Sequence, residues 1–323
     1  MTVSHPPDFD AFRALSARLG KDPLRVQGPG GNTSLKDGPV MWIKASGTEL
    51  ADAEVRSVFV PVDHVRALAE ARGQSGDGSC KGTVVDPEIG LRPSIETTFH
   101  AALDWPIVAH THSIATLVHA AGPAGRAAAR EKLAGLPAVF VPYAKPGLPL
   151  TGEIVARARP DTQVFVLENH GLIVTGQTTT EVAAVIEDVE QCLAMPPRAL
   201  APVSQSAPPP DGFDWAEESW IAKDAWATQL AVGGSYYPDH VVFLGPALPV
   251  AHTGDAPAVL HEGLGIAIRN GATPSQRAML RCLSDFLLHL PEDWVPEPIG
   301  PAAEADLMNW DAEKYRQALA ARQ

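Results

Sequence analysis

Two histidines separated by one residue, His110 and His112, end an apolar run that is expected to form a strand over 106–110. A strand points alternate side chains to one face, so this spacing directs both imidazoles to the same side. Glu96, expected in the first turn of a preceding helix, adds a carboxylate. Two imidazoles beside a carboxylate are typical of a divalent metal site, for which zinc is the usual ion.

A third nitrogen ligand is available in His170, within Glu168-Asn169-His170-Gly171, directly after the apolar run 164–167. Taken singly, each histidine could be an ordinary strand or turn residue, and Glu96 could be an acid favoured by the helix dipole. Three histidines combined with one carboxylate favour a metal centre over these separate explanations. We therefore expect one site with four metal ligands, namely His110, His112, His170 and Glu96.

Two turns of small residues are candidates for holding an anionic substrate. The loop 28–34 is rich in glycine, and the turn 45–48 contains Ser46 and Gly47. Backbone N–H groups of such a loop, and of the helix start near Ser94, can receive a phosphate without any basic side chain. The nearby lysines and the remaining histidines of this part are interpreted as exposed or packing residues: Lys36, Lys44, His64, His100 and His119.

The elements that must position these residues alternate between helix and strand. Asp37-Gly38 between two apolar segments predicts a hairpin over 34–44. We also expect helices at 8–19, 63–72, 113–121, 152–158 and 179–193, strands at 58–62, 139–143, 163–167 and 171–175, and a loop at 73–90. This order predicts an α/β fold of three layers, with helices on both faces of a central sheet that the hairpin makes mixed.

The last third of the chain is expected to be a smaller α/β extension. A segment rich in proline, 196–213, is interpreted as a linker between a domain over 1–195 and an extension over 214–323. Within the extension we expect helices at 215–231 and 275–290, strands at 240–244, 258–261 and 265–269, and a tail rich in Pro and Glu. The extension carries no motif that indicates chemistry, and its position alone suggests a part in a neighbouring subunit's site or in assembly.

Composition restricts the class of protein. Of 323 residues, 45% are hydrophobic and 20% charged, which is typical of a globular chain. The formal net charge of -13 argues against a nucleic acid or an anionic membrane as partner. Three widely spaced cysteines fit a reducing compartment, and the absence of a leader or an apolar run of membrane-spanning length predicts a cytoplasmic protein.

Three motifs occur in a characteristic order: Gly-Gly-Asn-Thr-Ser at 30–34, Pro-Ser-Ile-Glu at 93–96 with His-Thr-His at 110–112, and Asn-His-Gly at 169–171. With the Lys-Ala-Ser-Gly turn at 44–47, the chain resembles the class II aldolase/adducin family over roughly residues 8–195. In the wording of its motifs it is most similar to the aldolase half of bifunctional aldolase/short-chain dehydrogenase proteins.

This resemblance implies a zinc-dependent lyase of the fuculose- or rhamnulose-phosphate aldolase kind, with an α/β/α fold and a homotetrameric assembly. The substrate would be a ketose phosphate or a related hydroxy-keto sugar acid, cleaved through a zinc-stabilised enediolate. Glu96 would be the acid/base at the metal, with its pKa raised towards neutrality by burial. By the same resemblance, the residues that hold the substrate phosphate are Gly31, Asn32, Ser46, Gly47 and Ser94.

The sequence departs from the family pattern in two respects. Ile95 stands where a second serine is common, and the segment 122–137 lacks the tyrosine that protonates the leaving aldehyde, which leaves four tyrosines as candidates: Tyr143, Tyr236, Tyr237 and Tyr315. The same metal and enediolate chemistry could serve sugar-phosphate epimerisation, decarboxylation or dehydration, although an epimerase of this family usually carries aspartate at position 96. A non-catalytic binding module of the adducin kind would have no need of the three histidines.

Overall fold

The computed structural model describes residues 4–200, 206–250 and 254–322. A seven-stranded sheet has the order β3-β2-β1-β4-β7-β6-β5, and only β5 and β6 run parallel among its neighbouring pairs. The strands are β1 (Asn32–Asp37), β2 (Val40–Lys44), β3 (Phe59–Asp63), β4 (Ile107–Thr111), β5 (Ala138–Val141), β6 (Val164–Leu167) and β7 (Gly171–Gly176). The predicted mixed sheet is therefore confirmed.

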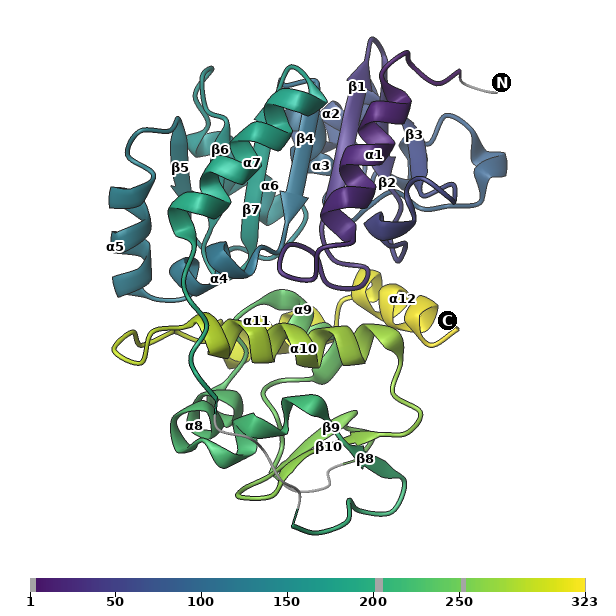
Figure 1. The fold of residues 1–323 in the computed structure, drawn as a ribbon. Helices are drawn as coiled ribbons and strands as arrows, with labels where there is room; N and C mark the ends of the chain where they lie inside the picture. Colours follow the sequence, from purple (N-terminus) through teal and green to yellow (C-terminus); the bar gives the residue numbers. More distant parts are fainter. Residues whose placement is uncertain (1–3, 201–205, 251–253, 323) are drawn as a thin grey trace.

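Helices cover both faces of this sheet (Figure 1). On one face lie α1 (Phe9–Gly20) and α7 (Thr179–Leu193), whose apolar stripes share a core with β1, β4 and β7. On the other lie α2 (His64–Ala71), α3 (Thr97–Ala102) and α6 (Leu148–Arg157). Alternation along β4 sends Ile107 and Ala109 to the first face and Val108 to the second. His110 therefore points to the face that carries α3.

The C-terminal region packs against one end of the large sheet (Figure 1). It contains a three-stranded sheet of order β8-β10-β9, formed by β8 (Phe213–Trp215), β9 (Ala258–His261) and β10 (Gly265–Arg269). Its helices are α8 (Ala225–Gly233), α9 (Pro238–Leu244), α10 (Pro274–His289), α11 (Pro301–Met308) and α12 (Asp311–Ala320). Side chains of α4 (Ile114–Ala120) join the core of this region, so the two parts share apolar packing.

Several predicted elements differ from those observed. The expected strand 240–244 is part of helix α9, which starts at Pro238 and is buried along its whole length, so its apolar run shows no helical period. The expected helix 215–231 is divided into the end of β8, a 3₁₀ helix η4 (Glu217–Lys223) and α8. The tail forms α11 and α12, and helix α5 (Pro123–Lys132) was not predicted.

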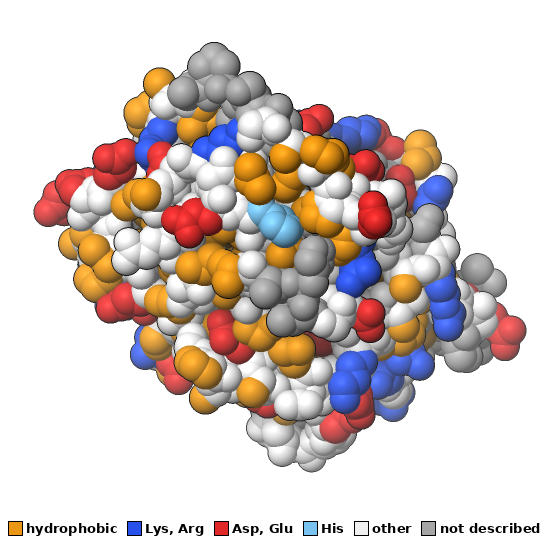
Figure 2. All heavy atoms as spheres, turned by 90° about the horizontal axis from the view of Figure 1, so that it is seen from below, with side chains coloured by type: hydrophobic (Ala, Val, Ile, Leu, Met, Phe, Trp, Pro, Cys, Tyr) orange, Lys and Arg blue, Asp and Glu red, His pale blue; other side chains and the backbone are white. Residues whose placement is uncertain are grey.

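Short 3₁₀ helices fill three connections: η1 (Leu50–Asp52), and η2 (Lys81–Thr83) and η3 (Pro87–Ile89) within the expected loop 73–90. Part of the predicted linker 196–213, residues 201–205, lies outside the described residues, and the domain boundaries remain a prediction. Seen from the end opposite the large sheet, acidic, basic and hydrophobic side chains are interspersed (Figure 2). Among the described helices, none has the length and apolar character needed to span a membrane.

Candidate metal centre and active site

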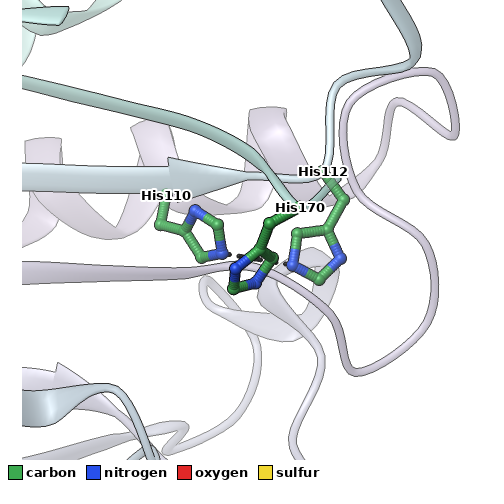
Figure 3. A group of neighbouring side chains, drawn as sticks. All are labelled: His110, His112 and His170. Atoms are coloured by element: carbon green, nitrogen blue, oxygen red, sulfur yellow. Dashed lines mark hydrogen bonds between the residues drawn. The ribbon is translucent and has the colours of Figure 1, made fainter. Parts of the chain in front are cut away.

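Strand β4 places the two histidines of the His-x-His pair at the centre of the sheet. His110 pairs with Asn32 of β1 on one side and with Ile173 of β7 on the other. His112 follows β4 directly and is 6% exposed, while His110 is fully buried. Both side chains project from the same side of the strand, as the spacing predicts (Figure 3).

His170 reaches the same point from the turn between β6 and β7. The preceding residue, Asn169, has a left-handed backbone with a φ of 53°. Its side-chain amide donates to the backbone oxygens of Tyr236 and Glu297, at 3.1 and 2.8 Å, so the C-terminal region fixes this turn. A side chain at Gly171 would place its Cβ 2.3 Å from the backbone oxygen of Thr111, which explains the glycine after the histidine.

The three imidazoles converge on one point (Figure 3). The Nε2 atoms of His110 and His112 lie 3.1 Å apart, and one nitrogen of each of the three rings lies within 4.8 Å of the others. Two nitrogen ligands of a tetrahedral zinc ion, each about 2.05 Å from it, are separated by about 3.3 Å. The spacing of the histidine pair therefore suits a metal ion.

Hydrogen bonds identify the nitrogen that is free in two of the rings. The Nδ1 atom of His110 donates to the backbone oxygen of Leu172 at 3.0 Å, which leaves the Nε2 lone pair directed inwards. The Nδ1 atom of His112 lies 3.4 Å from Oδ2 of Asp239, a carboxylate that can only accept. The Nε2 lone pair of His110 therefore points at Nε2 of His112, 3.1 Å away, where either a proton on His112 or a shared cation satisfies it. The donor set thus fits a divalent metal.

Glu96 stands beside this cluster at the N-cap of α3, one position before the predicted first turn. Its Oε2 atom is 3.5 Å from Nε2 of His110, and its Oε1 atom is 3.5 Å from Nε2 of His170. Oε2 accepts a 2.8 Å hydrogen bond from the amide of Asn32, while Oε1 has no hydrogen-bond partner among the described residues. Glu96 thus offers one oxygen atom to a ligand in the cavity.

Hydrogen bonds from His100 orient Asn32, the residue that donates to Glu96. His100 is fully buried, with Nδ1 2.8 Å from Oγ of Ser34 and Nε2 against Oδ1 of Asn32. Because Oδ1 accepts, the proton of His100 is on Nε2, and the amide NH₂ of Asn32 is turned towards Glu96. His100, interpreted as a packing or surface residue, is buried and in addition orients a residue of the site.

The pKa values favour neutral histidines and an ionised carboxylate. Burial lowers the pKa of His110 to about 4 and that of His170 to about 3, so both keep their lone pairs at neutral pH. Burial raises the pKa of Glu96, but the positive charges that His110 and His170 gain in acid, together with the hydrogen bond from Asn32, outweigh burial and leave the pKa lowered. The expected rise of this pKa towards neutrality was therefore wrong.

The predicted substrate-binding residues line one small cavity together with the cluster. Its lining includes Gly31, Asn32, Ser46, Gly47 and Ser94, as well as Glu96, His112 and His170. The cavity has a volume of about 20 Å³. A larger cleft of about 730 Å³ borders it and shares Ser46, Ile95 and Pro146. No tyrosine occurs among the described residues that line the inner cavity, whereas Tyr315 lines the outer cleft.

Sequence analysis missed a group of charged residues that the C-terminal region contributes. Asp239 of α9 and Glu313 and Arg316 of α12 all line the inner cavity and are at most 8% exposed. Arg316 donates to both carboxylates, at 2.8 and 3.2 Å to Asp239 and at 2.9 Å to Glu313. Burial raises the pKa of Glu313 to about 7, although Arg316 opposes this rise. The region thus completes the cavity of its own chain.

Lys44 also belongs to this cavity. The interpretation as an exposed hairpin lysine was wrong, because Lys44 is 3% exposed and donates to the backbone oxygen of Pro29 at 2.7 Å. Burial, reinforced by the charge of Arg316, lowers its pKa to about 7. Lys36 is likewise partly buried and donates to the backbone oxygen of Trp105 at 2.7 Å.

Comparison with known proteins identifies the family. Residues 14–196, more than half of the chain, match the family model described as the Class II Aldolase and Adducin N-terminal domain. This protein belongs to the class II aldolase and adducin family. The match confirms the resemblance and the fold inferred from the motifs, and it supports the expectation of an aldolase-type lyase.

The chain is also similar to individual proteins. The structure of the N-terminal class II aldolase domain of a conserved protein from Thermoplasma acidophilum is 27% identical, covers 60% of this chain and 95% of that chain, and has a TM-score of 0.51. The uncharacterized oxidoreductase YuxG of Bacillus subtilis is 31% identical over 205 residues, which are 58% of this chain. The aligned part is only 30% of that relative's length.

Proposed function

We propose that this protein is a metal-dependent aldolase that cleaves a ketose phosphate or a related hydroxy-keto sugar acid, with zinc as its metal. The single observation that supports this most strongly is the convergence of three buried histidines, two of them within 3.5 Å of Glu96, in a cavity of the class II aldolase fold. A homotetramer and a cytoplasmic location, which the sequence also predicts, belong to the same proposal.

In this proposal His110, His112 and His170 hold the metal, and Glu96 lies beside it. A bound divalent metal acts as a Lewis acid at the oxygen atoms of the substrate on which negative charge develops. Glu96 accepts and returns the proton at the substrate hydroxyl or carbon, since its Oε1 atom has no hydrogen-bond partner among the described residues and its lowered pKa keeps it ionised. Asn32 holds the other oxygen in place.

The turns around the cavity would hold the anionic group of the substrate. Ser46 and Ser94 line the cavity beside the backbone of Gly31 and Gly47, so hydroxyl and N–H donors face the same space. Lys44 adds a buried amine whose lowered pKa permits it to change charge near neutral pH. Through these local donors, an acidic protein can bind the phosphate or carboxylate group of a sugar.

Purified protein would first be analysed for zinc and then incubated, zinc-loaded, with a panel of ketose 1-phosphates. We expect release of dihydroxyacetone phosphate, measured by a coupled reduction assay. Glu96→Gln serves as the matched control, because it preserves shape and removes the base. Failure of zinc-loaded protein to cleave any ketose phosphate or hydroxy-keto acid in the panel would overturn the proposed reaction.

A further inference from the structure

The strongest unexplained feature of the C-terminal region is the buried carboxylate of Asp239. It is 2% exposed and lies in the first turn of α9. A helix dipole favours an acid at this position, but a solvent-exposed carboxylate serves the dipole without the cost of burial. The burial of Asp239 therefore calls for another explanation, which its two partners provide.

The first partner of Asp239 is the ligand histidine His112. Oδ2 of Asp239 lies 3.4 Å from Nδ1 of His112, the ring nitrogen that faces away from the metal position. Such contacts are often long in sites without their ligands and shorten once the ligand is bound. His110 directs its own Nδ1 to the backbone oxygen of Leu172, so the two neighbouring ligands are oriented in the same way by different acceptors.

The second partner, Arg316 of α12, fixes the carboxylate. Its NH1 and NH2 groups donate to Oδ1 and Oδ2 of Asp239 at 2.8 and 3.2 Å. This two-point contact defines the plane of the carboxylate and compensates its buried charge. Asp239 can therefore present a fixed, ionised oxygen to His112.

The glycine-rich loop leaves room for the contact. A Cβ atom on Gly30 would lie 2.9 Å from Nδ1 of His112 and 3.0 Å from Oδ2 of Asp239, tighter than ordinary van der Waals contact. Any side chain at this position would push against both groups at once. The glycine at position 30 is thus explained by the approach of the carboxylate to the imidazole.

We propose that Asp239 is a positioning residue for the metal site, holding His112 in the tautomer that presents Nε2 to the metal, with Arg316 holding Asp239 in turn. Carboxylates in this place orient the ring and increase its basicity as a ligand. The proposal rests on the metal site of the proposed function, and it assigns the C-terminal region a role in building that site within its own chain.

The experiment uses the full chain labelled with ¹⁵N-histidine and compares wild type with Asp239→Asn and Gly30→Ala. Zinc affinity is measured by competition with a chelator, and the tautomer of His112 by long-range ¹H–¹⁵N correlation in zinc-free protein. We expect either variant to lower zinc affinity about 10–100-fold and to give His112 a mixture of tautomers. Gly30→Ala retains both Asp239 and Arg316 and separates the carboxylate from the imidazole, so it remains informative if Asp239→Asn fails to fold.

The control is Glu304→Gln, which removes another buried carboxylate of the C-terminal region, one that accepts from the backbone N–H of Ser235. We expect its zinc affinity and His112 tautomer to match those of wild type. Wild-type affinity and a single Nδ1–H tautomer in Asp239→Asn would overturn the positioning role. Absence of zinc binding by wild type would overturn the metal centre, and the tautomer measurement in zinc-free protein would still decide the role of Asp239.

Discussion

The Nε2 atoms of His110 and His112 face each other at 3.1 Å, with the lone pair of His110 directed into the space between them. This separation is close to that of two nitrogen ligands on one zinc ion, so a metal can take the place of the shared proton. Together with His170, the pair forms the feature on which the proposed chemistry depends. Loss of one histidine of this pair should therefore weaken metal binding.

Replacement of His110 by glutamine should abolish tight zinc binding. The change removes one of three nitrogen ligands, so the loss should exceed the roughly 10–100-fold effect of removing an outer partner. Isothermal titration calorimetry and metal analysis of dialysed protein measure the loss of zinc affinity. The matched variant His64→Gln changes a histidine that bonds the backbone oxygen of Ala101, outside the cavity, and should retain wild-type affinity. Equal zinc affinities of His110→Gln and wild type would contradict the assignment of His110 as a metal ligand.

Replacement of Glu96 by glutamine should lower kcat about 10²–10⁴-fold, the range expected for loss of a general acid–base group. Zinc content should remain, because the three histidines are unchanged. Steady-state kinetics and metal analysis of the same sample separate these effects. Glu190→Gln, on α7 and outside the cavity lining, provides the control. A wild-type kcat in Glu96→Gln would contradict the catalytic role of Glu96.

Replacement of His100 by phenylalanine should reduce both stability and kcat. Ser34 and Asn32 would lose their buried partner, at about 1–3 kcal/mol for each group left unsatisfied. Asn32 would no longer be fixed towards Glu96, so kcat should fall while KM changes less. Urea unfolding and kinetics measure the two effects. His100→Gln keeps a donor and an acceptor and should recover part of both; equal loss in the two variants would argue for packing alone.

The buried histidines should make the metal-free protein sensitive to mild acid. Burial lowers the pKa of His110, His119 and His240 to about 4 and of His170 to about 3. Above pH 6.5 both folded and unfolded states hold these groups neutral. Between pH 6.5 and 4.5 only the unfolded state gains protons, so each group lowers the free energy of unfolding by up to about 1.4 kcal/mol per pH unit.

Glu313 opposes this trend, because burial raises its pKa to about 7. Burial also raises the pKa values of Glu190, Glu218 and Asp285, whereas the four histidines act over the whole range and should determine the slope. Urea unfolding of zinc-free protein at several pH values between 6.5 and 4.5 measures the net slope. The variant His119→Gln, in α4, removes one such group and should reduce the slope by about one proton. Stability that is constant or rises on acidification over this range would contradict the prediction.

Replacement of Gly47 by alanine should loosen helix α12. The new Cβ would lie 2.4 Å from a methyl group of Leu319, and the φ of 77° disfavours a side chain. We expect faster amide hydrogen exchange over 311–320. Gly38→Ala provides the control, because its φ of 57° carries a similar backbone cost and no heavy atom of the described residues lies within 4 Å of its Cβ. Equal exchange in both variants would exclude the steric effect.

The sequence predicted the N-terminal site because local patterns determine it. The His-x-His pair on β4 and His170 after a buried strand follow from strand alternation and from the pairing of neighbouring strands. Asp239 and Arg316 could not be predicted, since they lie 77 residues apart and meet the histidines only through tertiary packing. Pro238 at the start of α9 was the one local sign that its apolar run forms a helix.

The small inner cavity has a consequence for the catalytic cycle. Its volume of about 20 Å³ admits about one water molecule, whereas pockets for small ligands commonly measure about 300–1,000 Å³. Helix α12 lies between this cavity and the outer cleft, with Glu313 and Arg316 on the inner side and Tyr315 on the outer. An aldolase with this architecture would have to widen the inner cavity to admit a sugar, and the ionic contacts of α12 that line it would resist this widening and could limit turnover.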